Sequence, residues 1–359
     1  MVFFDSLFWQ PFFISTVVSF LLTWLTIRLA WRTNLIGIDD PQKHHHPKVV
    51  HQYAVPRGGG IPVFLSVTLI CFLFLPFNKH LRGIMLGGLV TLIVGLLDDK
   101  FDLNPYWRLL ANVLAALCVV GAGIGIAFIT SPLGGIIRLD QPRIIFEFLG
   151  SWRSIWLLSS LFGLFWIVWN MNIVGWSSGV DGQLSSFVVV AAIITAVLGF
   201  RFSADISQWP IVVLSAGVAG AYLGFLFWNF YPQKIMPGYS GKSLAGFYLA
   251  VLAILSGAKV ATMILVLGVP TVDAILTIGR RLKNGQSPVW GDRGHLHHKL
   301  LDLGWNKRTI SFFYLSSSIL LGLTALLLNS RQKLYAIIMV FITLLAFSIW
   351  FKMLLGKKR

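Results

Sequence analysis

Carboxylate side chains gather at the end of one apolar segment of this chain. Asp98 and Asp99 follow Gly95-Leu-Leu, and Asp102 lies four residues after Asp98. Asp98 and Asp102 share one helix face if the helix continues that far. Adjacent carboxylates repel each other unless a cation or a proton intervenes, and Mg²⁺ binds one or two carboxylates together with substrate phosphates and water. The pattern therefore predicts either a metal site or a solvated polar helix end.

A glycine-rich segment with two amides and a carboxylate follows a later apolar run. It begins with Asn170 and Asn172 and ends with Gly179, Asp181 and Gly182. Glycine allows the backbone to turn sharply and to approach a ligand closely. The segment is compatible with a site for a polar ligand and, equally, with an ordinary loop between helices.

A third cluster combines acidic, basic and imidazole groups. Asp273 lies in an apolar segment, and Arg280, Arg281 and the run Asp292-Arg-Gly-His295-Leu-His297-His298 follow it. A carboxylate in a transmembrane helix usually faces a cavity or a partner, and its simplest partner here is Arg280 or Arg281. Arginine binds phosphate, so the cluster indicates a phosphate site. Zinc is the alternative ligand because histidine binds it, but the spacing is not a standard zinc pattern.

The first polar loop carries histidines and a glycine run. His44 to His46 and His51 precede Pro56-Arg57-Gly58-Gly59-Gly60. Successive glycines can cradle a phosphate through their N–H groups. A plain loop is the simpler reading of this motif taken alone.

The elements that hold these residues are expected to be transmembrane helices. The chain is 56% hydrophobic and only 12% charged, whereas soluble domains average roughly 25% charged residues. Its apolar runs have about the length that spans a bilayer as helix and lack the alternation of a membrane β-barrel. We therefore predict an all-α polytopic membrane protein, a single domain over 1–359, with its N-terminal helix retained. About eleven spans are expected, at 11–31, 61–77, 83–97, 109–130, 154–173, 185–200, 210–228, 244–257, 260–278, 309–328 and 334–355.

Charge predicts which side of the membrane carries the chemistry. The net charge is +16, and Lys and Arg favour the loops on the same side as the C-terminus by about two to one, which the positive-inside rule makes cytoplasmic. Most Asp and His residues fall on that same side, and charge sorting does not explain them. An active site on the cytoplasmic face does. The positive charge also suits anionic lipid and phosphate-bearing substrates.

Together these segments resemble the polyprenyl-phosphate N-acetylhexosamine-1-phosphate transferase family, which is glycosyltransferase family four. Its relatives include the phospho-N-acetylmuramoyl-pentapeptide transferases. The matching pieces appear in family order, and the most specific runs from Pro270 to Leu300. The ending Asp292-Arg-Gly-His295-Leu-His297-His298 looks like the N-acetylglucosamine branch.

The resemblance implies a reaction and its partners. An oxygen of polyprenyl (undecaprenyl) phosphate attacks the β-phosphorus of a UDP-N-acetylhexosamine, UMP leaves, and a lipid-diphosphate sugar remains. The implied cofactor is Mg²⁺, with Mn²⁺ as an alternative. The implied location is the bacterial inner (plasma) membrane, at the first membrane step of a cell-envelope glycan such as lipopolysaccharide or teichoic acid. A homodimer is compatible with the family, and no nucleic acid is expected.

Roles are implied for individual residues by the same resemblance. Asp98 would activate the lipid phosphate, Asp99 would bind the metal, and Asp181 would bind the metal or the nucleotide, and these three are the candidate catalytic residues. The candidate substrate-binding residues are Gly59, Gly60, Asn172, Asn229, Lys242, Arg280, Arg281, His295, His297 and His298.

The chain departs from the family at positions that matter for a metal. Ser178 and Tyr239 stand where the family has aspartates, Lys242 stands where it has serine, and Arg108 stands where lysine is common. About three extra residues follow Asn172. Tyrosine is a poor Mg²⁺ ligand, since Mg²⁺ prefers carboxylates, phosphates and water, so the expected metal cage lacks two carboxylates.

Three hypotheses follow from these departures. Either Asp98, Asp99 and Asp181 suffice, with Lys242 supplying part of the charge neutralisation, or the protein binds lipid phosphate or nucleotide without catalysis. A transporter is the alternative from another class. Transporters favour ionisable groups near the midplane and two repeated halves, whereas here most carboxylates are expected at one face and no repeat is visible.

Overall fold

The computed structural model describes residues 5–37, 54–131, 134–148, 150–201, 208–257, 259–290 and 292–356. The prediction of an all-α polytopic membrane protein is confirmed. Eight helices of the described residues are long and apolar enough to cross a membrane. They are α2 (Gln10–Thr33), α4 (Lys79–Phe101), α6 (Leu157–Trp176), α7 (Gln183–Arg201), α8 (Trp209–Asn229), α9 (Gly238–Leu255), α13 (Lys307–Leu327) and α14 (Ser330–Gly356). The short π-helix η1 (Asp5–Trp9) precedes α2.

The other expected spans are shorter or broken. Helices α3 (Gly60–Phe74) and α5 (Pro105–Gly121) are apolar but shorter than the eight. The ninth expected span is a helix pair, α10 (Val260–Val266) and α11 (Gly268–Lys283), bent by 84°. A short helix, α12 (Leu296–Asp302), follows. Every expected span except 109–130 thus corresponds to a helix or a helix pair.

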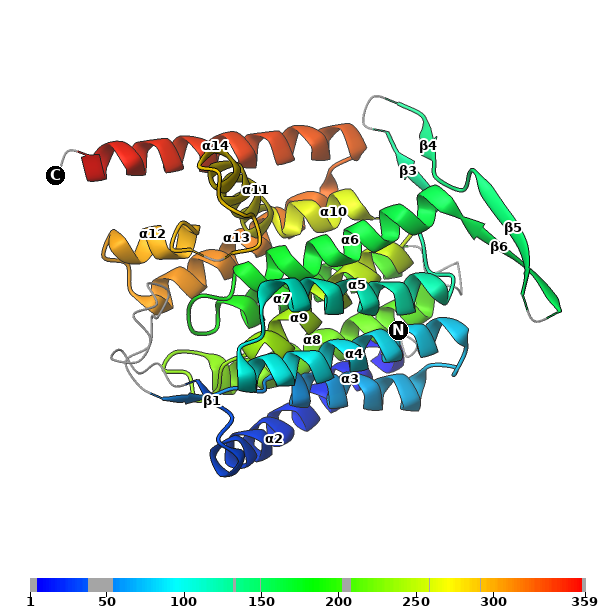
Figure 1. The fold of residues 1–359 in the computed structure, drawn as a ribbon, viewed down its shortest axis with the longest axis horizontal. Coiled ribbons are helices and arrows are strands. Elements are labelled where there is room, and N and C mark those ends of the chain that lie inside the picture. Colours follow the sequence, from blue (N-terminus) through cyan, green and yellow to red (C-terminus); the bar gives the residue numbers. More distant parts are fainter. Residues whose placement is uncertain are drawn as a thin grey trace.

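The span expected over 109–130 is longer than the helix found there. Helix α5 ends at Gly121, and Gly123 adopts a positive φ of 88°, a conformation that glycine tolerates and that ends a helix. The chain then forms two antiparallel hairpins, which lie at the opposite end of the helices from α12 (Figure 1). Their strands are β3 (Phe128–Thr130), β4 (Ile136–Arg138), β5 (Arg143–Phe148) and β6 (Ser151–Trp156). A third small ribbon pairs β1 (Ile36–Gly37) with β2 (Val55–Pro56).

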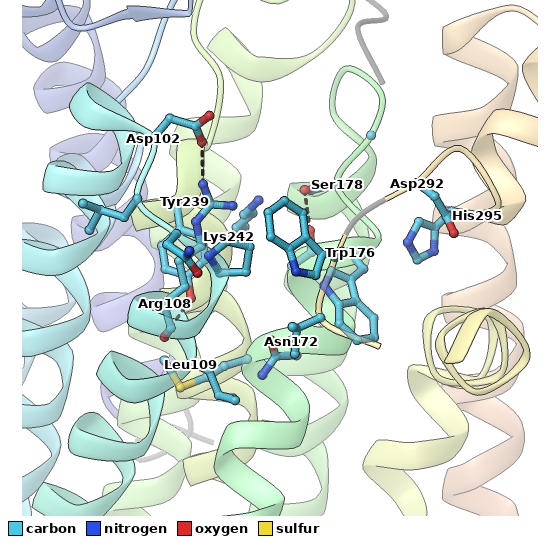
Figure 2. A pocket seen from close by; sticks show the side chains of 18 of the residues that line it. Asp102, Arg108, Leu109, Asn172, Trp176, Ser178, Tyr239, Lys242, Asp292 and His295 are labelled. Carbon is cyan, nitrogen blue, oxygen red and sulfur yellow. Dashed lines mark hydrogen bonds and ion pairs between the residues drawn. The ribbon is translucent and has the colours of Figure 1, made fainter. Parts of the chain in front are cut away.

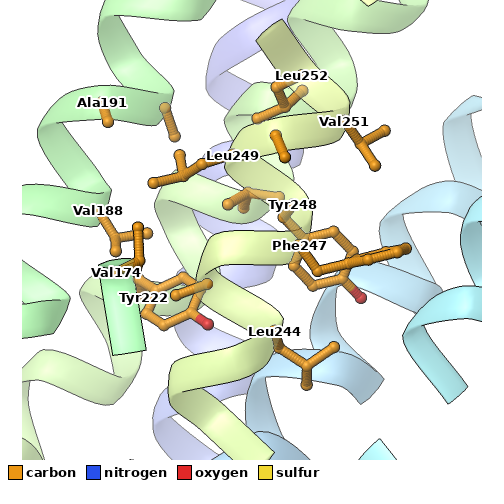
Figure 3. Packing of buried hydrophobic residues seen from close by; sticks show 14 of the residues in the cluster. Val174, Val188, Ala191, Tyr222, Leu244, Phe247, Tyr248, Leu249, Val251 and Leu252 are labelled. Carbon is orange, nitrogen blue, oxygen red and sulfur yellow. The ribbon is translucent and has the colours of Figure 1, made fainter. Parts of the chain in front are cut away.

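The packed centre of the bundle is formed by α7, α8 and α9. Figure 3 shows Phe247, Tyr248 and Leu249 of α9 lying among side chains of neighbouring helices, with Val188 and Tyr222 nearby. Close helix approach replaces the hydrophobic effect as the source of stability in a bilayer, and small residues permit it. Ser15 and Ser19 of α2 accordingly donate hydrogen bonds of 2.6 Å to carbonyls of α8. In contrast, almost no residue of α14 is fully buried.

The polar motifs meet at one end of this bundle. The C-terminal ends of α4 and α6 lie there with the N-terminal ends of α5 and α9 and with α12, and the end of α14 lies on the same side (Figure 1). The predicted grouping of the acidic and imidazole residues with the C-terminal side is therefore seen in the fold. The histidines His44 to His46 and His51 lie outside the described residues.

Candidate active site

A cavity of about 460 Å³ opens at this end of the bundle. Figure 2 shows Arg108, Tyr239 and Lys242 on one side of it and His295 with Asp292 on the other. We call the first group the cation side and the run His295 to His298 the histidine side. The predicted site residues that line the cavity are Asn172, Lys242, His295, His297 and His298. The predicted residues that do not line it are Gly59, Gly60, Asp98, Asp99, Asp181, Asn229, Arg280 and Arg281.

Asp98 is buried and bound by a cation from the next helix. Its Oδ1 accepts the N–H of Leu103 at 3.1 Å and the Nε–H of Arg108. The same guanidinium donates to Asp102 Oδ1 at 2.5 Å. Helix α4 ends at Phe101 because Asp102 adopts a left-handed φ of 48°. Asp98 and Asp102 are therefore brought together by Arg108 and not by a continuous helix face.

Asp99 ties the end of α4 to the start of α9. Its carboxylate accepts the N–H of Tyr239 at 2.6 Å and the N–H and hydroxyl of Ser240 at 3.3 and 2.7 Å. A carboxylate is well placed there because helix N-termini carry partial positive charge and unpaired N–H groups. Gly238 is required at this point, since a β-carbon would overlap the carboxylate and the residue has a φ of 65°.

The predicted glycines Gly59 and Gly60 serve packing in this structure. A β-carbon on Gly60 would lie against Ser240, and one on Gly59 would lie against Phe225 and Pro237. The Gly60 N–H donates to the Ser240 hydroxyl at 3.2 Å. These glycines let the first loop approach the end of α9 that holds Asp99.

The cation side is built around the ring of Tyr239. The Lys242 ammonium lies 5.3 Å and the Arg108 guanidinium carbon 5.5 Å from the ring centre. Cations at this range from an aromatic face are attracted by the ring quadrupole. The phenol lies 3.2 Å from Asn112 Oδ1 and 3.3 Å from the Arg108 carbonyl, to which it donates. The tyrosine is thus a fixed support for two cations.

Asp181 and Asn229 form a separate buried group away from the cavity lining. Asp181 accepts the Gln233 N–H at 3.2 Å, and the Lys307 ammonium lies 3.4 Å from its other oxygen. Asn229 accepts from Ser185 at 3.0 Å and donates to Gln233 and to a backbone carbonyl. Both side chains hold the segment after α8 in place.

On the histidine side, the partner predicted for Asp273 was wrong. Its carboxylate binds His295 Nδ1 at 2.9 Å and the Leu296 N–H at 2.8 Å. The arginines of α11 point instead to Asp292. The sharp bend between α10 and α11 and the return of the chain at α12 bring His295 to Asp273, and a helix face alone could not predict this.

Arg281 is buried and connects several segments of this region. Its Nε donates to Asp292 at 3.1 Å, its Nη1 donates to the Pro288 carbonyl at 2.5 Å, and its guanidinium lies 5.5 Å from the Trp176 ring centre. Arg280 also binds Asp292, at 2.7 Å, but is partly exposed. Burial alone would raise the pKa of Asp292, but the hydrogen bonds from Arg281, the Gly294 N–H and Arg280 outweigh it and hold that pKa below its usual value.

His297 and His298 are buried as neutral imidazoles. Burial, followed by the neighbouring imidazoles, lowers the pKa of His297 well below its ordinary value, and burial with the nearby Arg293 lowers the pKa of His298 to about 4. Among the described residues, neither Nδ1 atom has a hydrogen-bond partner. Gly179 makes room for His297, since a β-carbon there would overlap the imidazole. Two unsatisfied polar rings at a cavity indicate a polar ligand.

Asn172 and its neighbours complete the lining between the two sides. The Asn172 amide donates to the Val168 carbonyl at 2.7 Å, which leaves its oxygen for a ligand. Ser178, at the position where an aspartate was expected, donates to the Gly175 carbonyl at 2.7 Å. Figure 2 places Asn172 and Trp176 between the cation side and the histidine side.

The carboxylates do not assemble into a metal cage. No three His, Cys, Asp or Glu side chains among the described residues are grouped as metal ligands would be. Asp99 accepts three hydrogen bonds from α9, and Asp181 lies beside Lys307. The arrangement does not fit a resident Mg²⁺ at Asp99 and Asp181, so that metal stays a prediction from the family resemblance.

The sequence reasoning missed three residues that shape the site. Ser240 and Asn112 fix Asp99 and Tyr239, and Trp176 supports Arg281. Ser240 lies between Tyr239 and Lys242, two positions noted as departures from the family, and Trp176 lies within the run from Asn172 to Gly182. Neither has a side chain whose type alone indicates chemistry.

Comparisons with known proteins add an independent line of evidence. Residues 81–257 match the model of a family described as glycosyl transferase family 4. The chain is 26% identical over 343 residues to the probable undecaprenyl-phosphate N-acetylglucosaminyl 1-phosphate transferase of Bacillus subtilis, covering 93% of this chain and 88% of the relative. It is 25% identical over 317 residues to the undecaprenyl-phosphate alpha-N-acetylglucosaminyl 1-phosphate transferase of Escherichia coli, covering 84% and 80%. A decaprenyl-phosphate N-acetylglucosaminephosphotransferase of Mycobacterium tuberculosis is 27% identical over 293 residues, covering 73% and 69%.

Proposed function

The chain belongs to glycosyl transferase family 4, and we propose that it transfers N-acetylglucosamine-1-phosphate from UDP-N-acetylglucosamine to a polyprenyl phosphate. The observation that carries the proposal is the cavity itself, where fixed cations face neutral imidazoles at one end of a membrane bundle. The names of the relatives support the sugar and the lipid. Undecaprenyl phosphate is the proposed acceptor.

The proposed reaction exchanges one phosphoanhydride bond for another. An oxygen of the lipid phosphate attacks the β-phosphorus of the nucleotide sugar. The bond from that phosphorus to the oxygen of the α-phosphate breaks, UMP leaves with the electron pair, and the sugar stays on a lipid diphosphate. Phosphoryl transfer depends mainly on positioning and on neutralisation of charge, and both are functions that this chain's own side chains can perform.

The cation side is proposed to receive the phosphates. Both substrates are anionic, and Lys242 and Arg108 present positive charge at the cavity. Arg108 also holds the Asp98 carboxylate in one orientation. Asp98 remains the candidate to accept a proton from the lipid phosphate, while Asp99 positions α9, and with it Lys242, against α4.

The histidine side is proposed to hold the leaving nucleotide. Neutral His297 and His298 can each donate one N–H to a phosphate oxygen without adding charge. Arg281 and Asp273 do not line the cavity, so their proposed role is to position His295 and the turn before it. Asn172 is the proposed contact for the base or the sugar.

The cellular setting is proposed from the family and the fold together. The cavity end of the bundle would face the cytoplasm, where UDP-sugars are found, in the inner (plasma) membrane. The product would begin a cell-envelope glycan. A homodimer is part of the same proposal and needs its own measurement. The residues present do not fit a resident Mg²⁺, so a need for Mg²⁺ is left to the two arms of the assay below.

The test is a transferase assay on the purified chain with undecaprenyl phosphate and a panel of UDP-sugars. UDP-N-acetylglucosamine should give both UMP and the lipid diphosphate product, with and without added Mg²⁺ as separate arms. Asp98→Asn and Asp99→Asn should each lower the rate by on the order of 100-fold, as loss of an aligned charged group in phosphoryl transfer does. Full activity of Asp99→Asn would overturn the site assignment.

A matched control is available in Asp302→Asn. Asp302 is exposed and pairs with Arg293 at 3.0 Å, away from the cavity lining, so its loss of charge should leave the rate within about twofold, because exposed ion pairs contribute little. No UMP from any UDP-sugar would contradict the proposed reaction.

A second candidate is a protein that binds nucleotide or lipid phosphate without catalysis. The observation that favours it is that Asp98, Asp99 and Asp181 are already engaged by partners within the protein, with no cage of carboxylates among the described residues. Saturable nucleotide binding without UMP release at any Mg²⁺ concentration would decide for it.

A further inference from the structure

We propose that Lys242 and Arg108, held on the ring of Tyr239, form the diphosphate-binding part of the cavity, so that the nucleotide binds there without a divalent cation. The inference rests on the proposed function for the identity of the nucleotide. It goes beyond that function because it states that side chains, and not a divalent cation, neutralise the charge of the bound diphosphate.

The first argument is the fixed geometry of the two cations. Tyr239 is held by its N–H on Asp99 and by its phenol near Asn112. Lys242 and Arg108 then lie 5.3 and 5.5 Å from its ring centre, and all three residues line the cavity. Figure 2 shows them close together on one side. Preorganised cations bind an anion with less loss of side-chain entropy than free ones.

The second argument is the balance of charge around the cavity. Its two acidic lining residues are already bound, Asp102 by Arg108 and Asp292 by Arg281. Among the described residues, Lys242 forms no ion pair of its own, although Asp98 and Asp99 interact with it electrostatically. Its ammonium therefore has hydrogens left to donate to phosphate oxygens, and lysine is a common phosphate binder.

The third argument is the state of the carboxylates that a metal would need. Both oxygens of Asp99 accept hydrogen bonds from the start of α9. Arg108 holds Asp98, and the side chain at position 239 is a phenol that is itself engaged. A divalent cation would have to displace these partners, whereas an anionic diphosphate can approach Lys242 without breaking any of them.

The experiment measures binding of UDP and of uridine to the full chain in lipid nanodiscs, by calorimetry, with EDTA and with Mg²⁺. For the wild type, the Kd of UDP in EDTA should lie within threefold of its value in Mg²⁺. Lys242→Met should weaken UDP binding at least tenfold and leave uridine binding within twofold, because uridine carries no phosphate. Lys242→Arg should restore most of the UDP affinity.

Two further variants sharpen the result. Lys283→Met removes the same charge from an exposed position of α11 outside the lining and should leave UDP binding within twofold. Tyr239→Asp with Lys242→Ser places a third carboxylate beside Asp98 and Asp99 and removes the ammonium. The Kd of UDP for this double variant should be at least tenfold lower in Mg²⁺ than in EDTA, since clustered carboxylates need a cation. Unfolding temperatures of all variants serve as the check on folding.

Several outcomes would overturn the inference. They are loss of wild-type UDP binding in EDTA, unchanged UDP binding by a folded Lys242→Met protein, or an equal loss of uridine and UDP binding. Failure of the proposed function looks different, because cation-independent UDP binding that depends on Lys242, with no UMP formed from any UDP-sugar, would leave the inference standing and refute the transferase.

Discussion

The two sides of the cavity control charge in opposite ways. On the cation side, the buried Asp99 is satisfied by N–H and hydroxyl donors at the start of α9, so positive side chains remain to face the cavity. On the histidine side, the cation Arg281 is buried and consumed by Asp292, while neutral imidazoles face the cavity. The cation side therefore presents positive charge to the cavity, whereas the histidine side presents neutral hydrogen-bonding groups.

Because of this difference, separate measurements should distinguish the effects of changes on the two sides. Changes on the cation side should act on the binding of anionic groups and should depend on salt, since such interactions are screened. Changes on the histidine side should act on stability and on the position of the nucleotide. The following three predictions test that division, beginning with the largest effect.

Arg281→Met should give the largest loss of stability. It leaves the carboxylate of Asp292 with the partly exposed Arg280 and the Gly294 N–H, and it removes the hydrogen bond to the Pro288 carbonyl. Removing one partner of a fully buried ion pair costs about 3–5 kcal/mol, and we expect the lower end of that range because Asp292 keeps Arg280 as a partner. The unfolding temperature in detergent should fall steeply and activity should be lost. Arg280→Met is the matched control and should cost less than about 1 kcal/mol, as an exposed ion pair does. Equal losses in both variants would show that Arg281 does not organise this side.

Gly179→Ala should weaken nucleotide binding with a smaller effect on folding. The added methyl group overlaps the His297 ring and must displace it from its position at the cavity. We expect the KM for UDP-N-acetylglucosamine to rise about tenfold, equivalent to ~1.4 kcal/mol. Gly279→Ala in α11 is the control, because a β-carbon there has no neighbour within 4 Å and alanine favours helix. A KM unchanged by Gly179→Ala would remove His297 from the site.

The third prediction concerns acid stability. An unfolded histidine has a pKa of about 6.5, whereas burial and Arg293 lower the pKa of folded His298 to about 4. Between these values the unfolded chain binds more protons, so the free energy of unfolding falls as the pH falls. From pH 7.5 to pH 5 the protein should lose about 2 kcal/mol of stability from this residue.

His298→Gln should remove that part of the pH dependence. Its unfolding temperature should differ less between pH 7.5 and pH 5 than that of the wild type, measured in the same detergent and salt. The pKa of Asp292 is also lowered, but a depressed carboxyl titrates below this window. An identical pH dependence in both proteins would mean that His298 is accessible to protons in the folded state.

Much of the fold could be predicted from apolar runs, and the errors have clear causes. The expected span over 109–130 failed because the glycines after Gly121 end the helix while the chain stays apolar in the hairpins. The expected span over 260–278 is bent at Leu267, and hydropathy does not report direction. Hydropathy therefore located the helices but not where they stop or turn.

The candidate site was predicted in part, and the errors concern pairing. The histidine run, Asn172 and Lys242 do line one cavity. The predicted partner of Asp273 was wrong. Arg280 and Arg281 lie seven and eight residues after it on the same helix, but the side chain that binds it is His295, 22 residues later in the chain. The role of Tyr239 as a support for cations could not be read from its type.

Composition and apolar run length alone determined that this chain is a helical membrane protein with its polar motifs at helix ends, because a bilayer leaves the backbone no partner outside a helix or a closed barrel. Which charged side chains are paired within the protein and which face the cavity depends on the tertiary structure. Asp99 finds its donors 140 and 141 positions along the chain, and contacts at that separation depend on how the helices pack and not on any local pattern.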